Sequence, residues 1–349
     1  MTLLKITKTT DYVCRADTSL RDVLARLNSA NPLYCQIVVD ADGKVVGTMT
    51  DGDIRRGLLC GLTLSSPAAD CMFTAFKHGL ANDPEGNIKQ LYDKRRPVNF
   101  LPVLDEASRL TEIIAYDPEV DIGISQAVIM AGGFGTRLGE LTRNTPKPLV
   151  EVNGKPILEH VLQSLEDAGI DRIDITVHYK ADQIRRFVKA RTNKAAIALA
   201  EESEPLGTAG ALALLPETPK DTTLVINGDV ITDVDYGALH QFYLRHNYDA
   251  VVCVSPYSVD VPFGVVEFDQ AGGFRGIQEK PKITRHIAAG VYYLSPEVFA
   301  LIRRGERIDM PEVLERAHGM GMKIGVFPIH EYWIDLGRPT DIHAFTKDR

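Results

Sequence analysis

The sequence has few cysteines, no long apolar run and no excess of positive charge. Its five cysteines show no C-x-x-C spacing, so neither a disulfide framework nor a cysteine metal site is indicated, and we expect a reducing compartment. The N-terminal stretch MTLLKITKTTDYV lacks the apolar core of a secretory signal, and no segment is apolar over the length of a membrane span. A net charge of −8 argues against a general nucleic-acid binder. We therefore expect a cytoplasmic protein that binds neither nucleic acid nor membranes.

What is present is the composition of a large globular protein. Hydrophobic residues make up 44% and charged residues 25% of the 349 positions, which allows a sizeable core. A chain of this length is long for one domain, so two are expected. The patterning changes near residue 122 and predicts domains over 1–122 and 123–349.

The first domain contains a unit of one helix and two strands that occurs twice. Leucine and valine recur on one helical face behind an Asp-Thr-Ser cap in the first unit, and a turn joins its two strands. The predicted elements are a helix at 17–28, strands at 35–39 and 44–50, a helix at 87–94, and strands at 99–103 and 109–115. The repetition indicates an internal duplication, and a polar linker is expected over 116–123.

The second domain alternates strands and helices. Strands are predicted at 125–131, 172–178, 195–200, 222–226 and 250–254, and helices at 154–168, 181–189 and 235–246. Such alternation is typical of an α/β fold with a mainly parallel central sheet, whose ligands lie at the carboxyl ends of the strands. A hairpin-like stretch over 264–279 predicts an antiparallel insertion beside the site.

The strongest local pattern is a glycine-rich loop directly after the first strand of this domain. It reads Gly132-Gly133-Phe134-Gly135-Thr136-Arg137. Glycines allow a tight turn whose N–H groups approach phosphate oxygens, and Arg137 adds a charged fork. No Lys-Ser/Thr pair follows, so this is not a Walker A loop. A lysine comes later, at Lys147 between two prolines.

This loop, followed by Pro-Lys-Pro, resembles the signature of the sugar-1-phosphate nucleotidyltransferase family, and similarity extends over 125–341. The resemblance implies a Rossmann-like domain, an Mg²⁺ cofactor, and transfer between a nucleoside triphosphate and a sugar 1-phosphate with release of pyrophosphate. It implies catalytic roles for Arg137, Lys147 and Lys280. It also implies a nucleotide-binding loop formed by Ala131, Gly132, Gly133, Gly135 and Thr136.

Two further matches concern the family's nucleobase-binding segment and its metal-binding aspartates. Glu-Pro-Leu-Gly-Thr-Ala-Gly resembles the segment along the nucleobase, which assigns base contacts to Gly207 and Thr208. Asp229 ends a buried strand and Asp335 lies in Trp-Ile-Asp-Leu-Gly, and the resemblance makes both metal ligands. Carboxylate oxygens suit Mg²⁺, although an isolated aspartate in such a place is more often a cap or turn residue.

The sugar-binding residues are implied by three shorter matches. Glu279 and Lys280 lie in a Gln-Glu-Lys-Pro sequence, where the family uses Glu for sugar hydroxyls and Lys for the sugar phosphate. Gly290 leaves room for the sugar ring, and Gly264 lies where the family often has Tyr-Gly. Without the resemblance, Glu-Lys-Pro is an ordinary solvated turn.

The sequence around Gly207 resembles that of mannose- and heptose-1-phosphate guanylyltransferases. GTP is therefore the expected substrate, and a GDP-sugar for surface glycans is the expected product. UTP, CTP and dTTP remain alternatives. A second hypothesis is a non-catalytic subunit that senses nucleotide sugars. Degenerate subunits of that kind would lose Arg137, Lys147 or a metal aspartate, and all are present here.

The stretch 38–59 resembles a CBS domain, so the first domain is interpreted as a tandem CBS module. In that family Thr-x-x-Asp, here Thr50 and Asp53, contacts the ribose of an adenine nucleotide. The second unit has Ala115 and Pro118 at the aligned positions. Two interpretations stay open, a regulatory nucleotide sensor and a scaffold without ligand. Because CBS modules often pair, we expect a homo-oligomer.

Overall fold

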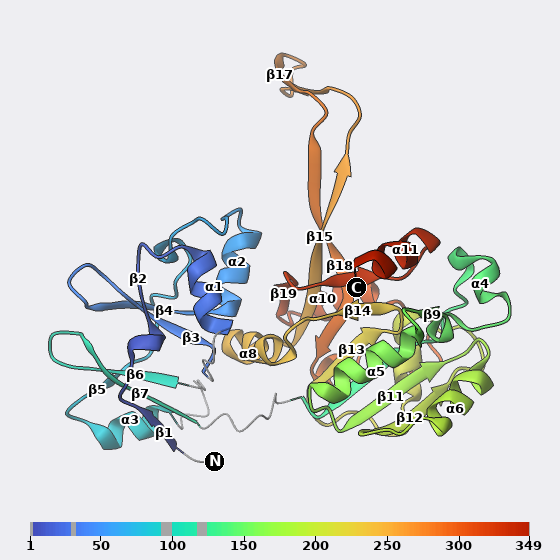
Figure 1. The fold of residues 1–349 in the computed structure, drawn as a ribbon, viewed down its shortest axis with the longest axis horizontal. Coiled ribbons are helices and arrows are strands. Elements are labelled where there is room, and N and C mark those ends of the chain that lie inside the picture. Colours follow the sequence, from blue (N-terminus) through green and yellow to red (C-terminus); the bar gives the residue numbers. More distant parts are fainter. Residues whose placement is uncertain (1–2, 29–32, 92–99, 117–123, 349) are drawn as a thin grey trace.

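The computed structural model describes residues 3–28, 33–91, 100–116 and 124–348. Figure 1 shows two modules, with helix α8 (Tyr236–His246) of the second module lying toward the first. The predicted linker after Tyr116 and the predicted boundary at residue 122 lie outside the described residues, as do the end of the predicted helix 87–94 and the start of the predicted strand 99–103. Within the described ranges, no helix has both the length and the apolar character needed to cross a membrane.

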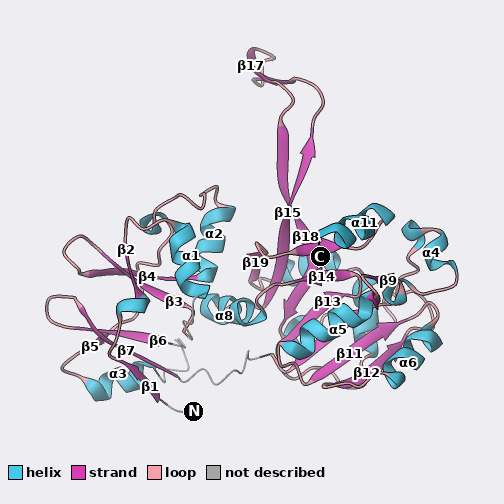
Figure 2. Ribbon diagram, viewed as in Figure 1, coloured by secondary structure: helices cyan, strands magenta, loops and turns pink. Residues whose placement is uncertain are grey.

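The N-terminal module consists of two similar units (Figure 2). The first contains β2 (Val13–Arg15), α1 (Leu20–Asn28), β3 (Cys35–Val39), β4 (Val45–Thr50) and α2 (Asp51–Leu59). The second contains β5 (Gly79–Leu80), α3 (Pro84–Leu91), β6 (Phe100–Leu104) and β7 (Leu110–Tyr116), with β1 (Leu3–Ile6) added at the edge.

The topology of the two units supports the predicted duplication. In each, the first strand is parallel to the second and the second pairs antiparallel with the third, so the sheets have the orders β2-β3-β4 and β1-β7-β6-β5. A helix connects the two parallel strands, as a crossover requires. In α1 the side chains of Leu20, Val23 and Leu27 are almost fully buried, which explains the apolar face seen in the sequence.

The second module is built on a seven-stranded sheet of order β12-β11-β8-β13-β18-β15-β19. Its strands are β8 (Gln126–Met130), β11 (Arg172–Val177), β12 (Ala196–Glu201), β13 (Thr223–Asn227), β15 (Ala250–Asp260), β18 (Lys282–Leu294) and β19 (Ile324–Pro328). All run in one direction except β18, which pairs antiparallel with both neighbours. The prediction of an α/β fold with a mainly parallel sheet is confirmed.

Helices and small ladders complete the second module. The helices are α4 (Glu140–Arg143), α5 (Ile157–Asp167), α6 (Ala181–Ala190), α7 (Gly207–Gly210), α8, α9 (Pro296–Phe299), α10 (Met310–Gly319) and α11 (Pro339–Asp348). Two small antiparallel ladders join β9 (Glu151–Val152) to β10 (Lys155–Pro156), and β14 (Val230–Thr232) to β20 (Trp333–Asp335). Helix α5 buries one apolar face, including Leu158, Leu162 and Leu165, in the main core.

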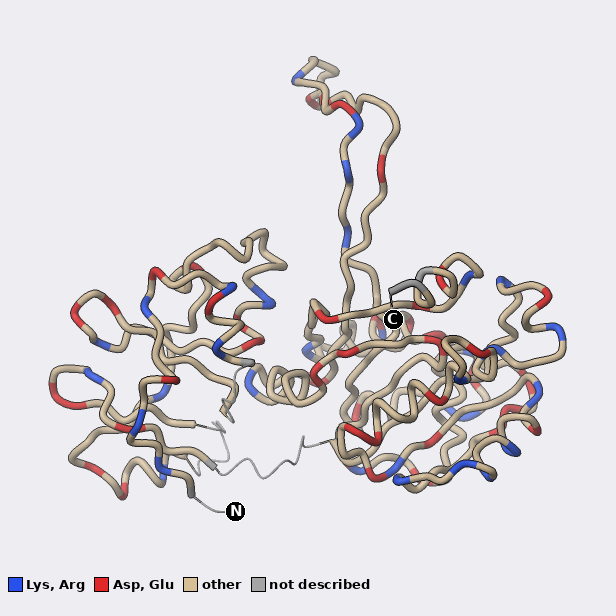
Figure 3. Tube along the Cα trace, viewed as in Figure 1, with Lys and Arg blue, Asp and Glu red and all other residues tan. Residues whose placement is uncertain are grey.

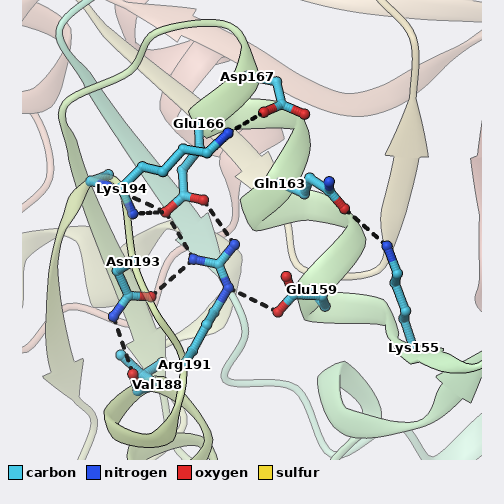
Figure 4. Close-up of polar contacts among 10 residues, drawn as sticks. Lys155, Glu159, Gln163, Glu166, Asp167, Val188, Arg191, Asn193 and Lys194 are labelled. Carbon is cyan, nitrogen blue, oxygen red and sulfur yellow. Dashed lines mark hydrogen bonds and ion pairs between the residues drawn. The ribbon is translucent and has the colours of Figure 1, made fainter.

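A polar network ties α5 to the segment before β12 (Figure 4). Arg191 donates to both carboxylate oxygens of Glu166, each at 2.8 Å, and to Glu159 at 2.8 Å. Glu166 also accepts the backbone N–H of Lys194 at 2.9 Å. The hydrogen bonds from Arg191 lower the pKa of Glu166 to about 2. Because the network lies at the amino end of β12, opposite the ligand-binding edge, it is structural.

The predicted hairpin over 264–279 does not lie beside the site. It forms β16 (Val265–Phe268) and β17 (Phe274–Gln278) at the end of a long two-stranded arm made by β15 and β18. Figure 1 shows this arm projecting away from both modules. The sequence predicted the antiparallel pairing correctly, but its position is a consequence of how far β15 and β18 continue beyond the sheet.

The two modules meet where α2 packs against α8 and β19. Arg55 of α2 is buried and reaches across to the second module. It donates to Glu331 at 2.5 and 3.0 Å and to the carbonyl of Pro328, and its guanidinium lies 4.3 Å from the ring centre of Phe327. It also pairs with Asp51, whose pKa burial raises. A buried, multiply bonded arginine of this kind fixes the modules in one orientation.

Candidate functional site

The glycine-rich loop follows β8 at the carboxyl edge of the sheet. Gly135 has φ 64°, and a Cβ there would lie 2.8 Å from the Cβ of Lys147. Gly132 packs against Glu202, so a side chain at Gly132 would collide with that carboxylate. The hydroxyl of Thr142 donates to the Gly135 carbonyl at 2.9 Å and holds the loop closed. These positions need glycine because the loop lies directly against Lys147 and Glu202.

Lys147 lies between the two predicted metal aspartates. Its ammonium forms an ion pair with Asp229 and lies 3.9 Å from Asp335 Oδ1. The flanking residues Pro146 and Pro148 are buried and restrict the segment that carries this lysine. The structure therefore brings together three residues that the sequence placed in separate motifs.

The short ladder between β14 and β20 explains how the aspartates meet. Val230 pairs with Asp335, and the Leu336 N–H donates to the Asp229 carbonyl at 2.9 Å. Burial, and next the charge of Asp229, raise the pKa of Asp335 to about 6, although Lys147 acts in the opposite direction. Two close carboxylates beside one lysine are a strongly charged arrangement that favours a cation or a phosphate with its counter-ion.

The donor set fits a divalent metal held jointly with substrate. Asp335 Oδ1 is buried and accepts no hydrogen bond from any described residue. No group of three or more His, Cys, Asp or Glu side chains suited to a metal occurs in the described ranges. Protein side chains of these ranges would therefore not complete the coordination of a metal ion by themselves. Magnesium commonly binds one or two carboxylates and completes its shell with water and phosphate oxygens.

A pocket of about 280 Å³ opens above these residues. It is lined by Met130, Ala131, Gly132, Gly133, Phe134, Lys147, Pro148, Thr176, Glu202, Pro205, Gly207, Thr208, Asn227, Gly228, Asp229 and Asp309. Most of the predicted nucleotide-binding residues are therefore in it. Thr136 and Arg137 lie outside the lining in an exposed turn, and the charge of Arg137 still acts on Asp335.

Gly207 and Thr208 form the opposite wall of this pocket and are tied to α10. Gly207 has φ 82°, and a Cβ there would lie 2.6 Å from the Ile308 carbonyl. Thr208 donates its N–H to Asp309 at 2.7 Å and accepts from the Met310 N–H at 2.9 Å. Both residues thus shape the wall by binding the start of α10, a structural role that the sequence did not predict.

Glu202 was missed by the sequence analysis and lies in the pocket wall. It is only 7% exposed, and its Oε2 accepts the Leu206 N–H at 2.9 Å. Burial raises its pKa. A signal was present, because an acidic residue directly follows a strand that ends at the ligand-binding edge.

The predicted sugar-binding residues are divided between two places. Gly290 has φ 69° and lies against Asn227, so it is beside the pocket. Gly264, Glu279 and Lys280 lie on the arm, exposed and absent from the pocket lining. Neither Glu279 nor Lys280 forms a side-chain hydrogen bond with another described residue. One chain by itself does not assemble the predicted sugar site.

An arginine of the second module binds the two residues predicted to contact a nucleotide in the CBS module. Arg245 of α8 donates to Thr50 Oγ1 at 2.9 Å and lies 3.1 Å from Asp53 Oδ2. Asp53 is fully buried and also accepts the Thr50 N–H at 2.9 Å. Thr50 and Asp53 therefore form a capping box for α2 and an anchor for Arg245 at the same time.

A second cavity, of about 500 Å³, lies where this anchor meets α8. The N-terminal module contributes Thr48, Thr50 and Phe73, and α8 contributes Phe242 and Arg245. A Cβ on Gly52 would lie 2.7 Å from the Phe242 ring, so this glycine permits the close approach of the two modules.

Fold and site together define an α/β protein with a charged, glycine-lined pocket at the carboxyl edge of its central sheet. The chain belongs to the nucleotidyl transferase family, because a model of that family matches residues 126–349. A model of the CBS domain matches residues 6–59. Both parts of the resemblance drawn from the sequence are confirmed.

Several curated relatives are named mannose-1-phosphate guanylyltransferases. Mannose-1-phosphate guanylyltransferase catalytic subunit beta of Drosophila pseudoobscura pseudoobscura is 36% identical over 230 residues, covering 62% of this chain and 60% of the relative. Probable mannose-1-phosphate guanylyltransferase 1 of Oryza sativa subsp. japonica is 34% identical over 226 residues, covering 62% of each. The chain thus spans about three-fifths of the length of these relatives.

Solved structures agree on the fold. A crystal structure of HddC from Yersinia pseudotuberculosis complexed with GMP-PN aligns with a TM-score of 0.50 and 28% identity, over 64% of this chain and 99% of that chain. A putative glucose-1-phosphate thymidylyltransferase from Bacillus anthracis aligns with a TM-score of 0.51 at 23% identity, over 64% and 94%. Nucleotidyltransferases of this family generally use a divalent metal ion.

Proposed function

We propose that this chain transfers a guanylyl group from GTP to a sugar 1-phosphate and so forms a GDP-sugar and pyrophosphate. The observation that carries the proposal is the position of Lys147 between Asp229 and Asp335 under the glycine-rich loop, in a chain of this family. The guanylyltransferase names of the curated relatives support the choice of base.

The proposed chemistry needs positioning and charge neutralisation rather than a covalent intermediate. An oxygen of the sugar phosphate attacks the α-phosphorus of GTP, the bond to the β-phosphate breaks, and pyrophosphate leaves in line. The loop N–H groups and Arg137 bind the β- and γ-phosphates, and Lys147 neutralises charge on the reacting phosphates. The ion pair with Asp229 holds the Lys147 ammonium in the pocket before the nucleotide arrives.

We further propose that Asp229 and Asp335 are the ligands of Mg²⁺. A bound Mg²⁺ supplies Lewis-acid polarisation of a phosphoryl oxygen. Asp229 and Asp335 would hold the ion beside the pocket, where its charge would offset that of the substrate phosphates. The Lys147 ammonium, which lies near both carboxylates, would contact the same phosphates.

Glu202 is the residue we propose to recognise guanine. The Watson–Crick edge of guanine presents adjacent N–H donors, and a carboxylate offers two acceptor oxygens. Glu202 is buried in the pocket wall, where one carboxylate oxygen lies against Gly132 and the other accepts the Leu206 N–H just before Gly207. A buried acceptor that pairs with one base is left unpaired by another, which discriminates strongly between substrates.

Pyrophosphate release tests this proposal with Mg²⁺ and GTP, ATP, CTP, UTP or dTTP against mannose, glucose, glucosamine, N-acetylglucosamine and heptose 1-phosphates. We expect release with GTP and one sugar. Glu202→Gln should lower kcat/KM for GTP by roughly 10–100-fold, because one charged acceptor is lost. Glu204→Gln, on the exposed part of the same loop, is the matched control and should change little.

Each other result has a definite meaning. Release with UTP, CTP or dTTP alone would reject guanine and keep the transfer reaction. GTP binding without any release would favour a non-catalytic, nucleotide-sugar-sensing subunit, although Arg137, Lys147, Asp229 and Asp335 are all present in the sequence. Absence of triphosphate binding would overturn the proposal.

For the N-terminal module, we propose that an adenine nucleotide competes with Arg245 for Thr50 and Asp53. Arg245 is one of two charged partners of Asp53, together with Arg56, and it also binds Thr50, so the wild-type chain should bind AMP or ATP weakly. Arg245→Ala should raise the affinity roughly 10–100-fold, the cost of one hydrogen-bonded charge contact. Titration calorimetry on the full chain measures it.

Arg304→Ala serves as the control, since this arginine is exposed in the same module as Arg245. It should leave nucleotide affinity unchanged. If neither the wild type nor Arg245→Ala gives a heat of binding, the module is a scaffold and the sensor interpretation is wrong.

A further inference from the structure

Within the described part of the chain, the projecting arm formed by β15 and β18 is a ribbon of two strands only. Strand β19 pairs with β15 only as far as Val254, and β13 pairs with β18 only from Val291 onward. Beyond these points the ladder continues through six pairs, from Ser255 opposite Ile287 to Asp260 opposite Lys282. No residue from Pro256 to Ala288 is buried. An isolated hairpin of this kind is marginally stable in water, so it needs a partner surface.

The arm exposes large apolar side chains that one chain does not cover. Each of the following is more than half exposed: Tyr257, Val259, Phe263, Phe268, Phe274 and Ile277. Burying each such side chain contributes about 1.5–3 kcal/mol. A concentration of exposed aromatic residues on a projecting element is typical of a protein-binding surface.

The same arm carries residues that the catalytic site lacks. Glu279 and Lys280 lie beyond the last ladder pair, whereas Gly290 lies beside the pocket. At about 3.3 Å per residue, the six pairs place Glu279 and Lys280 roughly 20 Å beyond the sheet. The arm of a chain can reach its own pocket only if this continuous ladder is broken or sharply bent.

Charge also favours a contact between the arm and a pocket of this kind. The returning side of the arm carries Lys280, Lys282 and Arg285. Figure 3 shows blue lysine and arginine segments along the projection. The pocket lining contributes the carboxylates Glu202, Asp229 and Asp309 against the single ammonium of Lys147. A basic strand and an acidic pocket edge are complementary.

We propose that the arm of one copy of this chain docks over the catalytic pocket of a second copy and supplies Glu279 and Lys280 to it. The exchange is reciprocal, so two copies form a closed dimer in which both apolar arm surfaces are covered. The sugar phosphate then contacts Lys280 from one chain and reacts over Lys147 of the other. The roles given to Glu279 and Lys280 rest on the proposed function. The exchange of arms between two chains rests on the geometry of the arm.

Complementation between two inactive variants tests the composite site. Lys280→Ala and Asp229→Asn are each expected to lose nearly all pyrophosphate release. A co-expressed mixture should regain about a quarter of wild-type activity, because half of the random dimers are mixed and each mixed dimer has one intact site. No recovery, in a mixture shown by mass spectrometry to contain mixed dimers, would mean that the arm acts within its own chain.

A matched pair guards against a false positive. Lys147→Ala with Asp229→Asn places both defects in the same pocket, so no mixed dimer has an intact site and no recovery is expected. Recovery in this pair as well would overturn the composite-site explanation.

A readout without catalysis separates the inference from the proposed function. Analytical ultracentrifugation of the wild type should show a dimer, and Phe268→Asp with Phe274→Asp should shift it to monomer while circular dichroism stays unchanged. A monomeric wild type would overturn the exchange whatever the activity. If the wild type releases no pyrophosphate with any substrate but forms an arm-dependent dimer, the proposed function fails and the exchange stands.

Discussion

Asp229→Asn is expected to lower kcat by roughly 10²–10³-fold while the chain stays folded. Loss of one preorganised charge at a reacting phosphate costs about that much. Asp229 is half-buried at the end of β13, and its backbone carbonyl keeps the hydrogen bond from Leu336. The amide retains the shape of the side chain but removes the charge that pairs with Lys147 and that we assign to Mg²⁺.

Steady-state kinetics at several Mg²⁺ concentrations measures this effect. We expect a higher apparent Mg²⁺ requirement in Asp229→Asn, which a purely structural role would not produce. Asp221→Asn, exposed just before β13, controls for charge removal in the same region and should behave like the wild type. Turnover of Asp229→Asn within about two-fold of the wild type would contradict the metal assignment.

The core of the site could be predicted because its parts are local motifs on strands whose direction is predictable. Parallel strands put their carboxyl ends at one edge, and this brings the loop after β8 and Asp229 after β13 together. The position of Asp335 could not be predicted from strand direction alone, because only the β14–β20 ladder places it opposite Val230. From the sequence, only the family resemblance indicated that Asp335 and Asp229 act together, as metal ligands.

Other features depend on tertiary contacts that no local pattern encodes. Arg245 binds Thr50 across 195 positions of sequence, and nothing in the alternation around α8 distinguishes it from a surface arginine. The arm was predicted as a hairpin, but period-two patterning does not reveal whether a hairpin packs on its own sheet or leaves it. The position of Glu202 directly after a strand is a local signal, but its burial depends on Gly132 and Leu206 packing around it.

Arg55→Met is expected to release the N-terminal module and to lower its free energy of unfolding by about 3–5 kcal/mol, the usual cost of removing one partner of a buried charge cluster. The variant keeps most of the apolar stem but leaves Glu331 and Asp51 without their cation. In the wild type, burial opposes ionisation of Glu331, yet the hydrogen bonds from Arg55 outweigh it and hold the pKa of Glu331 low. Without Arg55, the buried Glu331 must take up a proton, find water or move out of the interface.

Two optical probes can resolve this effect because the chain has a single tryptophan. Trp333 lies in β20 of the second module, where its indole donates to the Ala289 carbonyl at 2.8 Å. Its fluorescence therefore reports that module, whereas far-ultraviolet circular dichroism reports both.

Urea transitions followed by the two probes should coincide in the wild type and in Arg21→Ala, an exposed control in α1. In Arg55→Met part of the dichroism should be lost at lower urea, before the fluorescence changes. Coincident, unshifted transitions would mean that the modules are held together by the apolar contact of Gly52 with Phe242, and that the charged cluster only sets their register.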